Sequence, residues 1–283
     1  MSPMNNRLLV PQKLPLLLDY APGATAAFSL RSLSNSYVGP VVTVRRSTDS
    51  AEADFTATEV SDGTLAAWCG GGDGFVKQWW DQSGTASHMQ QASASNQPKI
   101  VSAGVLVEKN NHPSVLFDGA NDFLSAGPFN NADKSDATGG ASFVVYSLSA
   151  ARESYTVFTN TPDATSHRDR FTGGTTYACT FRGSRFLAQP TSLPQLPSDL
   201  ILYSHSVNAA ANTHLMKKDA VQMLSQASDF SNWRAQVNVY YRIGLSVGPG
   251  DYAPAYISEV IMYGRALSSG EESRIEGDIA WRY

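Results

Sequence analysis

The sequence predicts an all-β protein, and three observations support that prediction. Charged residues make up only 16% of the 283 residues while 22 are glycine, a balance typical of proteins rich in turns. Short stretches of β-branched and aromatic residues recur along the chain, separated by Gly, Pro, Asn, Asp and Ser. The sequence has no long amphipathic helix and no alternation of strands with helices, so a parallel sheet is not expected. A sandwich of short strands is the predicted architecture.

The predicted elements cover most of the chain. Residues Ala24–Leu33 are predicted as a strand or a short helix, and Asp62–Cys69 as a short helix that ends at the glycines 70–72. A hairpin is expected over Thr213–Leu224, with its turn at residues 217–219. The other strand candidates share apolar or alternating patterns and lie at Val41–Arg46, Asp54–Ala57, Phe75–Trp80, Ser114–Leu124 (with a tight turn inside it), Phe143–Leu148, Tyr155–Thr159, Tyr177–Arg182, Asp199–Val207, Val237–Val247 and Ala255–Tyr263.

The C-terminal stretch predicts a core strand followed by a capped helix. Tyr256–Tyr263 is rich in apolar and aromatic residues, and Gly264 interrupts it. Ser268 stands three residues before Glu271, which is the spacing of a capping box. This ending resembles the last strand and tail of concanavalin A-like, laminin-G-type jelly-roll domains. The resemblance implies a jelly-roll β-sandwich with a short C-terminal helix.

The N-terminal residues 1–16 are predicted to form an arm, and residues 17–283 a single jelly-roll domain. Pro3, Pro11 and Pro15 disfavour regular structure in the arm. Its apolar residues are too many for a solvated tail, so we expect them to dock on the domain or on a neighbouring chain: Leu8, Leu9, Val10, Leu14 and Leu16. The prolines also break the apolar run that a secretion signal requires.

Charge and cysteine content exclude several classes of function. The net charge of −4 does not indicate a nucleic-acid-binding protein. No apolar stretch is long enough to span a membrane. The five histidines are scattered without metal-site spacing. Cys69 and Cys179 are expected to be buried free thiols, with a single long-range disulfide as the alternative. A basic group around His167–Arg170 is expected to be a solvated loop, with an acidic partner as the alternative.

The N-terminal third carries a second resemblance. Ser29-Leu-Arg31, Tyr37-Val-Gly-Pro40, Val44-Arg-Arg-Ser47 and Trp80-Asp-Gln-Ser-Gly84 look like a module of tailed-phage structural proteins. The same module is similar to the start of the catalytic domain of certain α-L-arabinofuranosidases. Together with Phe117-Asp-Gly and the C-terminal stretch, the resemblance covers most of residues 17–283.

An arabinofuranosidase of the retaining type needs two carboxyl groups, one as nucleophile and one as general acid. The resemblance implies that the acid lies in a loop shortly before the last strand, where this chain has Asp251 in a different context. For the nucleophile no glutamate stands in a matching motif, because Glu153 lacks the flanking pattern. No catalytic residue is therefore assigned, and a protein without enzymatic activity is expected.

Three neighbouring residues are candidates for contact with a glycan or a partner. Trp79 and Trp80 are adjacent on a predicted strand, so one must face the core and the other needs a cover, which a loop, a partner or a ligand would supply. Asp81 opens a turn with Ser83 and Gly84, and a structural turn is favoured over a binding role.

Asp118, Asn121 and Asp122 offer oxygen atoms suited to calcium, but the same residues suit a tight hairpin turn, which is the favoured interpretation. No cofactor and no metal are assigned.

These observations predict a non-enzymatic virion protein of a tailed phage, acting as a capsid-decoration, fibre or tail-associated component made in the host cytoplasm. Its expected partners are other virion proteins, in a homo-oligomer or in many copies on a particle, with host-surface glycans as a candidate ligand. One alternative is a free-standing, lectin-like carbohydrate-binding module. The second alternative is an arabinofuranosidase-like glycoside hydrolase.

Overall fold

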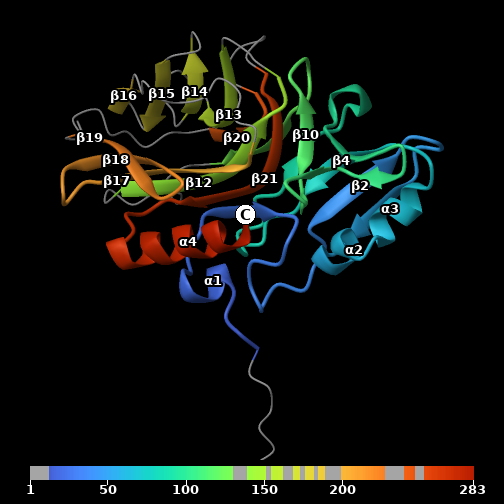
Figure 1. The fold of residues 1–283 in the computed structure, drawn as a ribbon, viewed down its shortest axis with the longest axis horizontal. Coiled ribbons are helices and arrows are strands. Elements are labelled where there is room, and N and C mark those ends of the chain that lie inside the picture. Colours follow the sequence, from blue (N-terminus) through green and yellow to red (C-terminus); the bar gives the residue numbers. More distant parts are fainter. Residues whose placement is uncertain are drawn as a thin grey trace, which may run out of the picture.

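Antiparallel strands pair into one continuous sheet of nineteen strands, which turns over on itself to form two facing layers (Figure 1). The computed structural model describes residues 13–129, 139–150, 154–161, 168–172, 176–181, 184–188, 199–226, 239–245 and 252–283. The predicted all-β sandwich with a short C-terminal helix is confirmed. Among the described residues, no helix is long and apolar enough to cross a membrane.

The strands fall into three groups by their pairing. The first layer consists of β1 (Ala26–Ser29), β10 (Val115–Asp118), β12 (Gly139–Leu148), β17 (Ile201–Asn208), β18 (Thr213–Lys218), β19 (Val221–Gln226) and β21 (Pro254–Tyr263). The second consists of β5 (Met89–Gln90), β11 (Leu124–Phe129), β13 (Ser154–Thr161), β14 (Arg168–Thr172), β15 (Thr176–Phe181), β16 (Ser184–Ala188) and β20 (Val239–Ile243). Joining them are β2 (Val42–Arg46), β3 (Glu52–Phe55), β4 (Gly74–Trp79), β6 (Lys99–Ser102) and β7 (Val105–Leu106), while β8 (Glu108–Lys109) and β9 (His112–Pro113) form a separate ribbon.

Strand β21 is the centre of the first layer. It pairs with β12 along one edge, and with β10 and then β1 along the other. The register shifts at Ser258, because Tyr146 opposes Ile257 whereas Val145 opposes Glu259. This bulge lets Ile257 contribute to the inner core while Glu259 does not.

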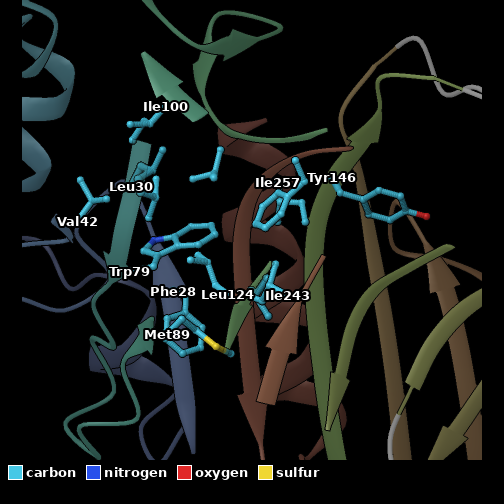
Figure 2. Close-up of a cluster of buried hydrophobic side chains, with 14 of the residues drawn as sticks. Phe28, Leu30, Val42, Trp79, Met89, Ile100, Leu124, Tyr146, Ile243 and Ile257 are labelled. Carbon is cyan, nitrogen blue, oxygen red and sulfur yellow. The ribbon is translucent and has the colours of Figure 1, made fainter. Parts of the chain in front are cut away.

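The main core fills the space between the layers. Figure 2 shows Phe28, Trp79 and Leu124 converging with residues of β20 and β21. The rings of Phe28 and Trp79 lie 6.2 Å apart, and both side chains are fully buried. Each large apolar side chain buried in this way contributes about 1.5–3 kcal/mol relative to exposure.

A second apolar cluster covers the outer face of the first layer. Helix α4 (Ser269–Arg282) places Ile275 and Ile279 there, and α1 (Leu17–Tyr20) adds Leu17 beside it (Figure 1). The predicted capping box is present, since Ser268 Oγ accepts a hydrogen bond from the Glu271 backbone N–H. The outer face of β21 is thereby removed from solvent.

Three local predictions need correction or receive support. The helix predicted over 62–69 is present as α3 (Thr64–Cys69). A second helix, α2 (Ala57–Ser61), precedes it and was not predicted; a capping box formed by Thr56 and Glu59 starts it. The hairpin turns at Asp219 and Ala220, two residues with positive φ, rather than at 217–219. Cys69 is a buried free thiol, as expected.

The residues of the predicted arm lie mostly outside the described part of the chain. Leu8, Leu9 and Val10 are among those not described. Leu14 is exposed and Leu16 is half-buried. The division into an arm and one domain stays a prediction.

Candidate active site

The two ends of the loop between β20 and β21 are held close together. After β20, Gly244 turns the chain with a φ of 85°, and Leu245 then forms an isolated β-bridge with Tyr252. The Ala253 N–H donates to the Gly244 carbonyl at 2.9 Å. Residues 246–251, which include Asp251, lie between these anchors and outside the described residues. The structure therefore fixes the points where this segment leaves and rejoins the sandwich.

A tight turn between β10 and β11 lies against the same anchors. Asp118 Oδ1 accepts hydrogen bonds from the backbone N–H groups of Ala120, Asn121 and Asp122, at 2.7, 3.1 and 3.3 Å. A Cβ on Gly119 would lie 2.7 Å from the Pro254 Cβ, so the turn packs directly on the start of β21. These bonds confirm a tight turn. Because β10 pairs with β21 and β6 whereas β11 pairs with β20 and β5, the turn connects the two layers and does not close a hairpin.

The described residues include no group of three or more His, Cys, Asp or Glu side chains that could hold a metal ion.

Asp122 is the ionisable group that distinguishes this turn. Its side chain is buried, and its Oδ2 accepts a hydrogen bond from the Asp118 N–H at 3.0 Å. Burial, and then the negative charge of Asp118, raise the pKa of Asp122 to about 7. A carboxyl group that keeps its proton near neutral pH is suited to act as a general acid.

The sequence did not identify Asp122 in this role. The turn that carries Asp122 packs on Gly244 and Pro254, which lie more than a hundred residues away in the chain. The only local signal is an acidic turn between two apolar strands.

Two other buried carboxylates are neutralised by cations. Glu259 receives two hydrogen bonds from Arg31, at 2.8 and 3.0 Å, and one from Ser29 Oγ at 2.8 Å. Glu276 on α4 receives bonds from Ser204 Oγ at 2.7 Å and Lys217 Nζ at 3.1 Å. Both join strands to the outer elements, which indicates a structural role.

Asp81 is also structural. It is buried, and its two oxygens accept five hydrogen bonds at 2.8–3.0 Å, from the backbone N–H groups of Ala27, Ser83 and Ser87 and the hydroxyls of Ser83 and Thr85. This is the turn arrangement that the sequence favoured over binding.

The adjacent tryptophans face opposite sides, as predicted. Trp79 lies in the main core. Trp80 is half-buried, donates from Nε1 to Thr43 Oγ1 at 2.9 Å, and packs on His88 at a ring distance of 4.6 Å. The loop after β4 therefore supplies at least part of the cover that Trp80 requires. A glycan contact at Trp79, Trp80 and Asp81 stays a prediction, and Trp79 and Asp81 offer no exposed surface for it.

Several residues singled out in the sequence fall outside what the structure describes. Glu153, Asp251, His167 and Arg182 are not described, and nothing is described of the Cys179 side chain. The assembly role of the arm residues is likewise untested.

The sequence matches the model of one protein family. The model of the α-L-arabinofuranosidase B catalytic domain matches residues 19–162, just over half of the chain. No curated protein matches the chain.

Solved structures of arabinofuranosidases share the fold. A GH54 α-L-arabinofuranosidase variant soaked with 4-nitrophenyl α-L-arabinofuranoside superposes with a TM-score of 0.65 at 14% identity. An arabinofuranosidase in complex with arabinofuranosyl-α-1,2-xylobiose gives 0.62 at 13% identity. Each match covers 93% of this chain and 64% of the other, so this chain spans less than two thirds of those proteins. At such identities the likeness shows the fold.

These findings overturn the functional prediction. The expected non-enzymatic virion protein is wrong, because the sequence matches a catalytic domain and nothing supports the phage relationship. The scaffold resemblance to arabinofuranosidases is confirmed. The predicted partners and localisation stay untested.

Proposed function

Because the chain belongs to the family of the α-L-arabinofuranosidase B catalytic domain, we propose that it is a glycoside hydrolase that acts on α-L-arabinofuranosides. The observation that carries the proposal is the family match over residues 19–162. The substrate class is taken from the arabinofuranosidases that share the fold.

The proposed active site lies where the β10–β11 turn packs on the base of the β20–β21 loop. Family resemblance makes Asp251, in the segment 246–251, the candidate general acid. Asp122 is the second candidate for that role, because its pKa of about 7 keeps it protonated at the start of the reaction. In either case the acid would donate its proton to the glycosidic oxygen as the bond to the sugar breaks.

Two substrates with different leaving groups test the proposal. We expect hydrolysis of 4-nitrophenyl α-L-arabinofuranoside and of an arabinofuranosyl xylo-oligosaccharide. Replacing the general acid should lower the rate of oligosaccharide hydrolysis by about 10²–10⁴-fold. The rate of hydrolysis of the nitrophenyl substrate should fall less, because nitrophenolate leaves without needing a proton. Asp251→Asn and Asp122→Asn should be compared, with exposed Asp54→Asn as the control.

The leaving-group dependence identifies the acid. If Asp122→Asn, and not Asp251→Asn, shows the larger loss on the oligosaccharide, then Asp122 holds the role. Absence of turnover on both substrates, together with measurable arabinoside binding, would instead favour the lectin-like alternative and contradict the hydrolase.

A further inference from the structure

A cavity of about 300 Å³ lies beside the last turn of α4, and Tyr283 both lines it and packs against the outer apolar cluster. It is lined by the end of α4, by α2, by the residues before α1 and by strand β9. Its size is at the lower end of the roughly 300–1,000 Å³ range of small-molecule sites, which suits a single sugar unit. It is separate from the proposed active site, because none of its lining residues belongs to the Asp118–Asp122 turn or to the loop anchors.

The lining combines the groups that recognise a sugar. Leu30 and Pro113 provide apolar surface, and Ser32, Thr58 and Ser61 provide hydroxyls. The rings of His112 and Tyr283 meet edge to face at 5.0 Å, which gives this wall an aromatic surface. An apolar floor with a few polar groups is the usual composition of a ligand site.

The charges in the lining favour an anion. Two arginines and one histidine line the cavity, and no aspartate or glutamate does. Arg31 is already bound to Glu259 and to Asp278, at 2.8 and 2.6 Å. Arg282 is exposed, and its side chain makes no ion pair or hydrogen bond within the described part of the chain.

Arg282 also acts on its neighbour. Burial, and then the positive charge of Arg282, lower the pKa of His112, so the guanidinium is close enough to affect the wall of the cavity. An anion bound beside them would form a charge-assisted hydrogen bond with Arg282.

We propose that this cavity binds a sugar unit that carries a carboxylate, with Arg282 as the group that recognises the acid. The hydroxyl side chains would bind the sugar hydroxyls, and the apolar floor would contact its C–H face. Binding at this cavity does not require hydrolysis and is measured without it.

Methyl β-D-glucuronide and methyl β-D-glucoside are matched probes, because they differ only in having a carboxylate or a hydroxymethyl group. Dissociation constants would be measured by saturation-transfer NMR, with acetate as a third probe. We expect the glucuronide to bind about tenfold more tightly than the glucoside, since a charge-assisted hydrogen bond is of that strength. Acetate should bind at least tenfold more weakly than the glucuronide, because it lacks the sugar ring.

Variants on one helix supply the control. Arg282→Gln should remove the preference for the glucuronide, while Arg274→Gln, an exposed arginine of α4 outside the cavity, should keep it. Equal binding of the two glycosides, no binding of either, acetate binding as tight as the glucuronide, or an equal effect of the two variants would each overturn the proposal. Arabinofuranosidase activity should be unchanged in Arg282→Gln, so that failure of the cavity proposal leaves the hydrolase proposal intact.

Discussion

Two glycines far apart in the sequence determine the environment of Asp122. A Cβ on Gly244 would lie 2.4 Å from Cδ1 of Phe117 and 3.0 Å from the Asp122 carbonyl, so a side chain there would push the turn away. Gly119 has the same constraint against Pro254. Both contacts hold the turn against the sandwich. Because burial is the main cause of the raised pKa of Asp122, that pKa reflects long-range packing as well as the acidic turn.

The pH dependence of stability tests this environment. The pKa of Asp122 is about 7 in the folded protein, compared with an ordinary value of 3.8. The folded state therefore holds a proton that the unfolded state loses. Its contribution is complete below the ordinary pKa and is lost as pH rises through about 7. We expect the free energy of unfolding of the wild type to fall relative to Asp122→Asn between about pH 4 and pH 8 in urea titrations.

Asp54→Asn, at an exposed position of β3, is the control for that titration. A constant difference between wild type and Asp122→Asn across the range would mean that Asp122 ionises as an ordinary aspartate.

This residue also marks the limit of what the sequence reveals about the site. The turn at 118–122 is predictable, because Asp-Gly-Ala-Asn-Asp between apolar strands has strong turn chemistry. The burial of Asp122 is not predictable, because the turn packs on Gly244 and Pro254, which are distant in the sequence. Asp251 could be named from resemblance alone.

At the scale of elements, helix α4 depends on its first turn. Ser268 and Glu271 form reciprocal capping bonds, and Arg265 binds Glu271 at 2.6 Å. The hydrogen bond from Arg265 is the main cause that lowers the pKa of Glu271 to about 2. Because Ile275 and Ile279 are fully buried, loss of the cap would loosen the cover of β21.

We expect Ser268→Ala to lower the free energy of unfolding by about 1 kcal/mol, the usual value of an N-cap. Ser273→Ala, at an exposed position inside the same helix, should be neutral or slightly stabilising, since alanine has the higher helix propensity. Chemical denaturation of both variants measures the difference. Equal effects would show that the cap contributes nothing specific.

Helices and turns were predictable from the sequence where one local pattern indicated a single structure. The C-terminal capping box follows from its spacing alone. Thr56 and Glu59 have the same spacing, but they lie beside a predicted strand at 54–57, so helix α2 was not predicted. The predicted position of the hairpin turn was wrong because Ala220 adopts a positive φ, which is uncommon for alanine and could not be expected from the sequence.

At the scale of the whole molecule, the motifs that carried the resemblance bind to one another. Gln82 accepts from the Leu33 N–H at 2.8 Å and donates to the carbonyls of Ser29 and Arg31, at 3.0 and 2.9 Å. Arg31 in turn binds Glu259 of the last strand. These residues join the beginning of the domain to its end. The motifs therefore stabilise the fold and do not by themselves indicate a function. For this reason they predicted the fold correctly and the function wrongly.

The boundary of the domain can be tested by truncation. Asn35 Nδ2 donates to the Leu14 carbonyl at 2.7 Å, and Leu17 is fully buried in the outer cluster. We expect deletion of residues 1–13 to leave the melting temperature nearly unchanged. Leu17→Ala should lower the free energy of unfolding by about 2–5 kcal/mol. A large loss of stability in the truncated protein would place the arm inside the folded domain.

The bridge between Leu245 and Tyr252 has a consequence for how such a scaffold can diversify. Because the two strands are clamped before the loop begins, the intervening residues can be exchanged or lengthened at little cost to β20 and β21. The sequence between the two anchors can therefore change while the strands that carry it stay constant. The same clamp offers protein engineers a defined pair of splice points for grafting loops from other members of the family.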